Sequence, residues 1–161
     1  MTSARDRCDE TVERIRSVRT EQFKYIRNFY PQRPMLQPND YKDTKPIVQR
    51  LRELHAQGKL SVMQEEILFS PSRPVEELYD VQADPFEIHN LASDPQFRST
   101  LETLRVRLDR WMVETHDLGP ESEKAYDANL ACELKAMPSN AHKEAILKNS
   151  ALMKQWASQG R

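Results

Sequence analysis

The feature that most constrains the fold of this sequence is an apolar stripe between Pro95 and about Glu114. The large apolar side chains there advance by four, three, four and three positions: Phe97, Leu101, Leu104, Leu108 and Trp111. This spacing puts them on one face of an α-helix. Asp94 is a suitable N-cap, and Pro95 fits the first helical position. The sequence therefore predicts a long amphipathic helix that must cover another element.

Segments rich in β-branched and aromatic residues provide that element. Residues 13–19 and 22–29 predict two strands joined by a tight turn, and residues 77–81 predict a third. Residues 1–11 are polar and are expected to be irregular. The sequence thus predicts an α+β fold, in which a small antiparallel sheet is packed by the long helix.

The rest of the chain predicts connectors and further helices. Four prolines make residues 30–46 an extended connector. Residues 46–56 predict a helix that Gly58 terminates. Ser61 and Gln64 have the spacing of a capping box at the start of a short helix.

The C-terminal part predicts two more helices, at residues 121–136 and 139–158, with less regular apolar faces. We expect a subdomain of residues 1–120 followed by a helical extension of residues 121–161.

Charge and hydropathy exclude several classes of partner. The 24 basic and 25 acidic residues give a net charge of −1, so the chain lacks the basic field of a nucleic-acid-binding protein. No apolar run is long enough to span a membrane, and the polar N-terminus lacks the apolar middle of a signal peptide. Cys8 and Cys132 are too few to define a disulfide framework or a zinc site. We expect no nucleic-acid and no membrane partner.

No self-sufficient catalytic site and no metal site are predicted. None of the histidines is paired at a metal-ligand spacing: His55, His89, His116 and His142. Glu114, His116 and Asp117 cluster after the long helix, and an acid/base or metal role there is one alternative. A histidine beside a helix C-terminus is also explained by the helix dipole.

A dense charged patch precedes the first predicted strand and consists of Arg5, Asp6, Arg7, Asp9 and Glu10. Arginine is suited to bidentate recognition of sulfate or carboxylate groups. A solvated leading segment is the alternative explanation.

Residues 69–73 read Phe-Ser-Pro-Ser-Arg, close to the C/S-x-P-S-R motif whose first residue is the sulfatase nucleophile. Phe69 stands at that position and has no nucleophilic atom, and Ser70 comes one place late. We therefore expect a proline-rich loop before a strand.

A series of short segments stands out along the chain: RSVRT at 16–20, FKYIRN at 23–28, ELYD at 77–80, DPFE at 84–87, NLA at 90–92, DP at 94–95, Trp111, and ETHD at 114–117. In this order, the series resembles the C-terminal subdomain of type I sulfatases, most closely the N-sulfoglucosamine sulfohydrolase (heparan N-sulfatase, sulfamidase) branch. The resemblance covers about residues 4–120.

The resemblance implies a small antiparallel sheet with a long helix, docked beside a large α/β lobe. In that family the large lobe supplies the formylglycine and the ligands of a calcium ion, so neither cofactor is expected in this chain. The family's leading segment can lie near the substrate pocket. Arg5, Asp6 and Arg7 are therefore our candidates for substrate contacts in an intact enzyme. Members of the family are commonly periplasmic, secreted or lysosomal.

We therefore expect a C-terminal structural subdomain of a sulfatase that hydrolyses sulfate esters or N-sulfates of sugars, with no activity of its own. Its partner would be a catalytic lobe in the same or a separate chain, and whether Met1 is the true start stays open. The alternative is a stand-alone module that binds sulfated glycans or a protein.

Overall fold

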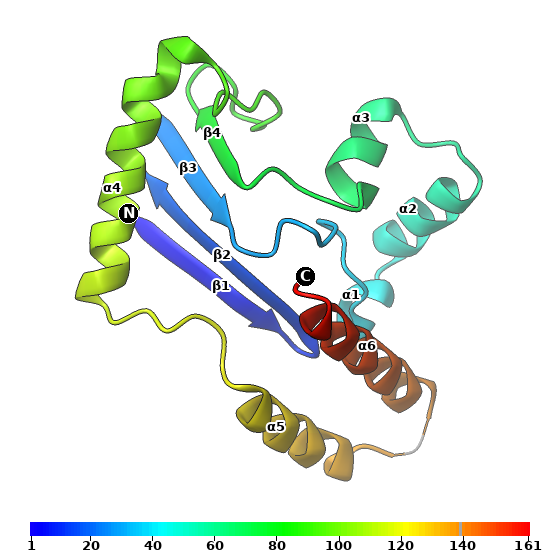
Figure 1. The fold of residues 1–161 in the computed structure, drawn as a ribbon. Helices are drawn as coiled ribbons and strands as arrows, with labels where there is room; N and C mark the ends of the chain where they lie inside the picture. Colours follow the sequence, from blue (N-terminus) through cyan, green and yellow to red (C-terminus); the bar gives the residue numbers. More distant parts are fainter. Residues whose placement is uncertain (139) are drawn as a thin grey trace. The chain divides into compact units, whose positions relative to one another are not determined.

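The computed structural model describes residues 1–138 and 140–161. Its strands are β1 (Thr2–Cys8), β2 (Thr11–Arg19), β3 (Phe23–Asn28) and β4 (Glu76–Asp80). They form one sheet in the order β1-β2-β3-β4, and β3 pairs antiparallel with both β2 and β4. The helices are α1 (Asp40–Asp43), α2 (Pro46–Ala56), α3 (Val62–Gln64), α4 (Arg98–Glu114), α5 (Glu123–Ala136) and α6 (Ala141–Ser158) (Figure 1). The predicted α+β class is confirmed.

Most predicted elements form near their expected ends. Strands β2, β3 and β4 begin and end within two residues of the prediction, and α2 matches it. Ser61 and Gln64 form the expected capping box. The predicted start of the last helix at residue 139 lies outside the described residues. Among the helices that the structure describes, none is long and apolar enough to span a membrane.

Two local predictions are wrong. The sequence predicts that residues 1–11 are irregular, yet residues 2–8 form β1. This strand forms because its backbone pairs with β2. Beside its first residue, the Arg19 N–H donates a hydrogen bond to the Met1 carbonyl oxygen. An edge strand can be polar on both faces, so side-chain patterning does not reveal it. The connector 30–46 contains the short helix α1, since the Asn39 side chain accepts a hydrogen bond from Lys42 N–H and caps it.

The chain divides into two compact units. The first consists of Met1–Asp6, Arg14–Tyr30 and Pro74–Gly119, and the second of Arg7–Glu13, Pro31–Arg73 and Pro120–Arg161. The expected domains, residues 1–120 and 121–161, stay a prediction.

The first unit has the predicted core. Val18, Tyr25 and Leu78 lie opposite one another on β2, β3 and β4 and are fully buried. The stripe of α4 packs on this row through Leu101, Leu104 and Leu108, with Phe97 and Trp111 at its ends. Figure 1 shows α4 lying along the sheet. The amphipathic helix is thus confirmed as the cover of the sheet.

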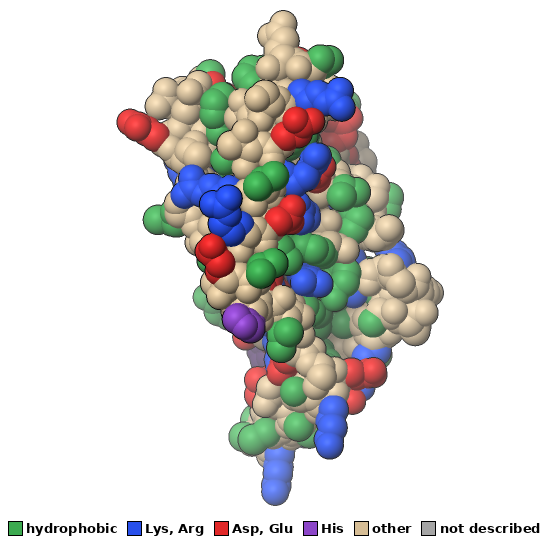
Figure 2. All heavy atoms as spheres, turned by 60° about the vertical axis from the view of Figure 1, so that its left-hand side comes forward, with side chains coloured by type: hydrophobic (Ala, Val, Ile, Leu, Met, Phe, Trp, Pro, Cys, Tyr) green, Lys and Arg blue, Asp and Glu red, His purple; other side chains and the backbone are tan. Residues whose placement is uncertain are grey.

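The outer side of α4 is a mixed surface. Figure 2, turned so that this side comes forward, shows hydrophobic, basic and acidic side chains interspersed. Val106 and Val113 are exposed here, between exposed charged residues such as Arg107 and Arg110. Such a pattern is typical of a solvent-facing helix surface.

The second unit has a smaller apolar cluster and a polar interior. Tyr126 and Leu130 of α5 pack with Ile146 of α6. Buried polar residues accompany them, among them Glu10, Glu13 and Asn149. Since buried polar groups need partners, this unit depends on specific hydrogen bonds as well as on apolar packing.

Candidate functional site

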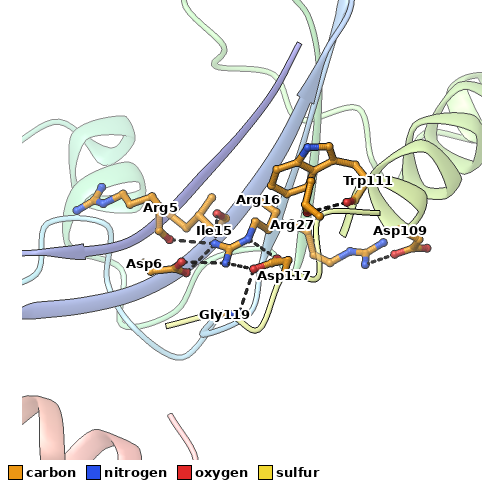
Figure 3. Close-up of polar contacts among 10 residues, drawn as sticks. Arg5, Asp6, Ile15, Arg16, Arg27, Asp109, Trp111, Asp117 and Gly119 are labelled. Atoms are coloured by element: carbon orange, nitrogen blue, oxygen red, sulfur yellow. Dashed lines mark hydrogen bonds and ion pairs between the residues drawn. The ribbon is translucent and has the colours of Figure 1, made fainter. Parts of the chain in front are cut away.

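A buried arginine stands at the centre of the first unit's polar contacts. Arg16 is 1% exposed. Its guanidinium donates to both carboxylate oxygens of Asp6, at 2.6 and 2.9 Å, and to both oxygens of Asp117, at 2.7 Å each (Figure 3). It also donates to the carbonyl oxygens of Arg5 and Ile15. We call Asp6, Arg16 and Asp117 the arginine clasp.

The clasp joins three separate segments of the first unit. Asp6 comes from β1, Arg16 from β2, and Asp117 from the turn after α4. Gly119 N–H donates to Asp117 at 3.0 Å, which fixes that turn. Bidentate arginine–carboxylate pairs have a defined orientation as well as strength. The clasp therefore holds the first strand and the end of α4 against β2.

The charges of the clasp stabilise each other. The hydrogen bond from Arg16, with a further one from Gly119 N–H, lowers the pKa of Asp117 to about 2, although burial acts in the opposite direction. The hydrogen bond to Asp117 raises the pKa of Arg16. Asp117 is therefore ionised at neutral pH and is unsuited to act as a general acid.

Acid should weaken the clasp. The folded pKa of Asp117 is about 2, below its ordinary value of 3.8. Its stabilising contribution is therefore present above about pH 4 and is lost as the pH falls towards 2. We expect the free energy of unfolding to fall by about 1–2 kcal/mol across that window through this group. Urea unfolding between pH 5 and pH 2 would measure it. In the Asp117→Asn variant, the free energy of unfolding should depend less steeply on pH. Parallel pH curves for the variant and the unchanged protein would contradict this account.

Gly119 is required for a close approach. It has φ +80°, and a Cβ added there would lie 2.8 Å from Nε of Arg14. Gly58 has φ +63° with nothing within 4 Å, so it is a matched control. We expect Gly58→Ala to cost about 1–2 kcal/mol for the left-handed backbone alone, and Gly119→Ala to cost more. Denaturant unfolding of both variants tests this prediction. Equal losses of unfolding free energy would show that the Arg14 side chain moves aside at no cost.

The candidate substrate-contact residues have different surroundings. Both oxygens of Asp6 are taken by Arg16. The guanidinium of Arg5 makes no hydrogen bond or ion pair within residues 1–138 and 140–161, and Figure 3 shows it pointing away from the clasp. Arg7 belongs to the second unit, where it pairs with Glu121 and lies 4.9 Å from the ring centre of Tyr126.

The alternative acid/base cluster has little to support it. Both oxygens of Asp117 are engaged by Arg16. His116 is exposed and has φ +53° at the end of α4, a position that terminates the helix. Within the described residues no three His, Cys, Asp or Glu side chains gather where they could hold a metal ion.

The Phe-Ser-Pro-Ser-Arg segment has a structural role in the second unit. The Phe69 ring stacks on His55, with 4.1 Å between ring centres. Arg73 donates to the Glu13 carboxylate at 2.8 Å, and both side chains are buried. Gln37 donates to the same carboxylate at 2.6 Å. Sequence reasoning missed the pair of Arg73 and Glu13, because these residues are 60 positions apart.

The segments that carry the family resemblance contact one another. Residues 16–20 and 114–117 meet in the clasp, through Arg16 and Asp117. Asn90 accepts a hydrogen bond from Leu78 N–H and donates to the Glu76 carbonyl, which ties the NLA segment to β4. These contacts therefore help to hold the first unit together.

Comparison with known proteins shows which proteins this chain is similar to. No protein-family model matches the chain. An ulvan-active sulfatase of Formosa agariphila is 43% identical over 123 residues, 75% of this chain and 20% of that protein. N-sulphoglucosamine sulphohydrolase of Homo sapiens is 34% identical over 103 residues, 64% of this chain and 20% of that protein. A further ulvan-active sulfatase of F. agariphila is 36% identical over 107 residues, 66% of this chain and 19% of that protein.

The chain is therefore homologous to a part of sulfatases, and the predicted relation to them is confirmed. It spans about a fifth of the length of these relatives. That coverage is consistent with a C-terminal sulfatase subdomain.

Proposed function

We propose that this chain is the C-terminal structural subdomain of a sulfatase, which completes the hydrolase fold and shapes one wall of the substrate pocket. The observation that carries the proposal is the 43% identity over 123 residues to a fifth of a sulfatase. The parent reaction would be hydrolysis of a sulfate ester or N-sulfate on a sugar, in line with the names of the relatives.

The catalytic parts would lie in a separate lobe, in the same or another chain. That lobe would supply the formylglycine and the calcium ion expected from the family. The described residues of this chain fit neither group. Phe69 stands where the nucleophile would be and stacks on His55, and no three His, Cys, Asp or Glu side chains gather there to hold a metal ion. We therefore assign no catalytic step to this chain.

Within the intact enzyme, Arg5 is the best placed of the candidate residues to contact an anionic substrate group. It lies next to Asp6, whose carboxylate is held by Arg16, and its own guanidinium is unpaired within the described part of the chain. Asp6 would then position the strand, and Arg7, paired with Glu121, would require that pair to open before it could bind.

Sequencing the DNA upstream of Met1 tests the proposal first. We expect an in-frame continuation or an adjacent reading frame that encodes C/S-x-P-S-R and the calcium-binding carboxylates. A promoter and ribosome-binding site with no such frame nearby would contradict it.

A second candidate function is a module that binds sulfated glycans, favoured by the Arg5 guanidinium, which has no partner among residues 1–138 and 140–161. Heparin-derived oligosaccharides should then bind the isolated chain, and Arg5→Ala combined with Arg7→Ala should abolish binding. Binding that is indifferent to these changes would eliminate Arg5 and Arg7 as the site.

A further inference from the structure

The two edges of the sheet differ in how their backbone groups are satisfied. Strands β1 and β4 are the edge strands (Figure 1). On the outer side of β4, the Leu78 N–H donates to the Asn90 side chain at 2.9 Å, and the Leu78 carbonyl accepts from the Leu91 N–H at 2.8 Å. The Glu76 carbonyl accepts from the Asn90 amide at 3.2 Å. The chain itself therefore closes this edge.

The hydrogen bonds beside the start of β1 show which of its backbone groups face outwards. The Arg19 N–H donates to the Met1 carbonyl at 2.8 Å, and the Met1 amino group donates to the Arg19 carbonyl at 2.9 Å. In an antiparallel pair, residues that exchange both bonds alternate with residues whose N–H and C=O point away from the partner strand. The Ser3 and Ser17 hydroxyl groups, 2.7 Å apart, agree with this register. The even-numbered residues of β1 therefore direct their backbone groups to the outer edge.

The outer edge of β1 is open between Thr2 and Asp6. At the far end of the strand, the Asn39 side chain donates to the Cys8 carbonyl at 3.0 Å and caps it. Outside β2, no residue among 1–138 and 140–161 hydrogen-bonds to the backbone of Thr2, Ala4 or Asp6. Unpaired groups that recur at every second residue are a template for another strand. This edge is therefore a candidate interaction surface.

The charges along the open edge suit a second copy of β1 in one register. In an antiparallel pair centred on Ala4, Thr2 lies opposite Asp6 and Ser3 lies opposite Arg5, so like charges do not face each other. A register centred on Arg5 or Asp6 would place like charges opposite one another, which is unfavourable. We propose that β1 pairs with β1 of a second copy in the register centred on Ala4, which gives one continuous sheet across a twofold axis. The proposal does not rest on the proposed sulfatase function.

Sedimentation equilibrium of the full chain over a concentration series tests the proposal. We expect reversible dimerisation that is weak, because the shared edge is short. Ala4→Pro should abolish the dimer, since proline lacks the N–H at the centre of the pairing. Its thermal midpoint should stay close to that of the unchanged protein, because an outward N–H of an edge strand has no partner within the chain. Ala4→Val keeps the N–H, and this matched control should still dimerise.

Two variants with the same net charge test the register. Ser3→Asp places a carboxylate opposite Arg5 of the second copy and should tighten the dimer about threefold, whereas Thr2→Asp places one opposite Asp6 and should weaken it by a similar factor. Effects of the same sign would overturn the register. A dimer that Ala4→Pro leaves intact would overturn the edge as the contact. A chain that stays monomeric at millimolar concentration would overturn the second copy as the occupant and leave the edge to a strand of another protein.

Discussion

Replacing Arg16 with alanine is expected to lower the free energy of unfolding by about 3 kcal/mol or more. Removal of one partner from a buried ion pair costs about 3–5 kcal/mol, because the remaining charge stays buried without compensation. Arg16 serves two carboxylates, and the Asp117 side chain is only 10% exposed. Asp6 is 31% exposed and can regain water, which places the expected loss towards the lower end.

Chemical denaturation of the purified variant would measure this loss. Arg19→Ala is the matched control, because Arg19 lies on the same strand but its side chain is half exposed. Its ion pair with Glu87 is also long, at 3.8 Å. Its loss should stay below about 1 kcal/mol. Similar losses for the two variants would show that the clasp does not organise the first unit.

Replacing Arg73 with alanine should have the second largest effect, a loss of about 3 kcal/mol. Arg73 and Glu13 have side chains only 6% and 2% exposed, and their pair lies at 2.8 Å. Arg73 also donates to the Arg33 carbonyl at 3.0 Å. The variant therefore leaves a buried carboxylate and a buried carbonyl short of donors.

The control for this variant is Arg50→Ala, which removes an exposed pair with Glu53 on α2. Exposed pairs of this type contribute about 0–1 kcal/mol. Thermal unfolding should separate the two variants by several degrees. If Arg73→Ala is as stable as Arg50→Ala, the buried pair is not essential to the second unit.

The long helix and the central strands could be predicted because their signals are local. The stripe from Leu101 to Leu108 has helical spacing, and the row of Val18, Tyr25 and Leu78 lies in segments of high strand propensity. Strand β1 was missed because its residues are polar, and only pairing with β2 makes it a strand.

The polar contacts could not be predicted, because they join distant parts of the sequence. Arg16 and Asp117 are 101 positions apart, and Arg16 looks like one of many arginines near the N-terminus. Both lie in segments that carry the sulfatase resemblance, so the resemblance pointed to them without stating their contact. The buried hydrogen bond from Asn149 to Glu10, which joins residues 139 positions apart, had no sequence signal either.

Sulfate release is the measurement that tests the central claim most directly. The chain would be assayed alone, and then together with the catalytic lobe that we propose as its partner, on a sulfated oligosaccharide such as one from ulvan or heparan sulfate. We expect no sulfate release from the chain alone and none from the lobe alone, but release from the two together, reduced by Arg16→Ala. Sulfate released by this chain alone, or full activity of the lobe without it, would contradict the assignment of a structural sulfatase subdomain.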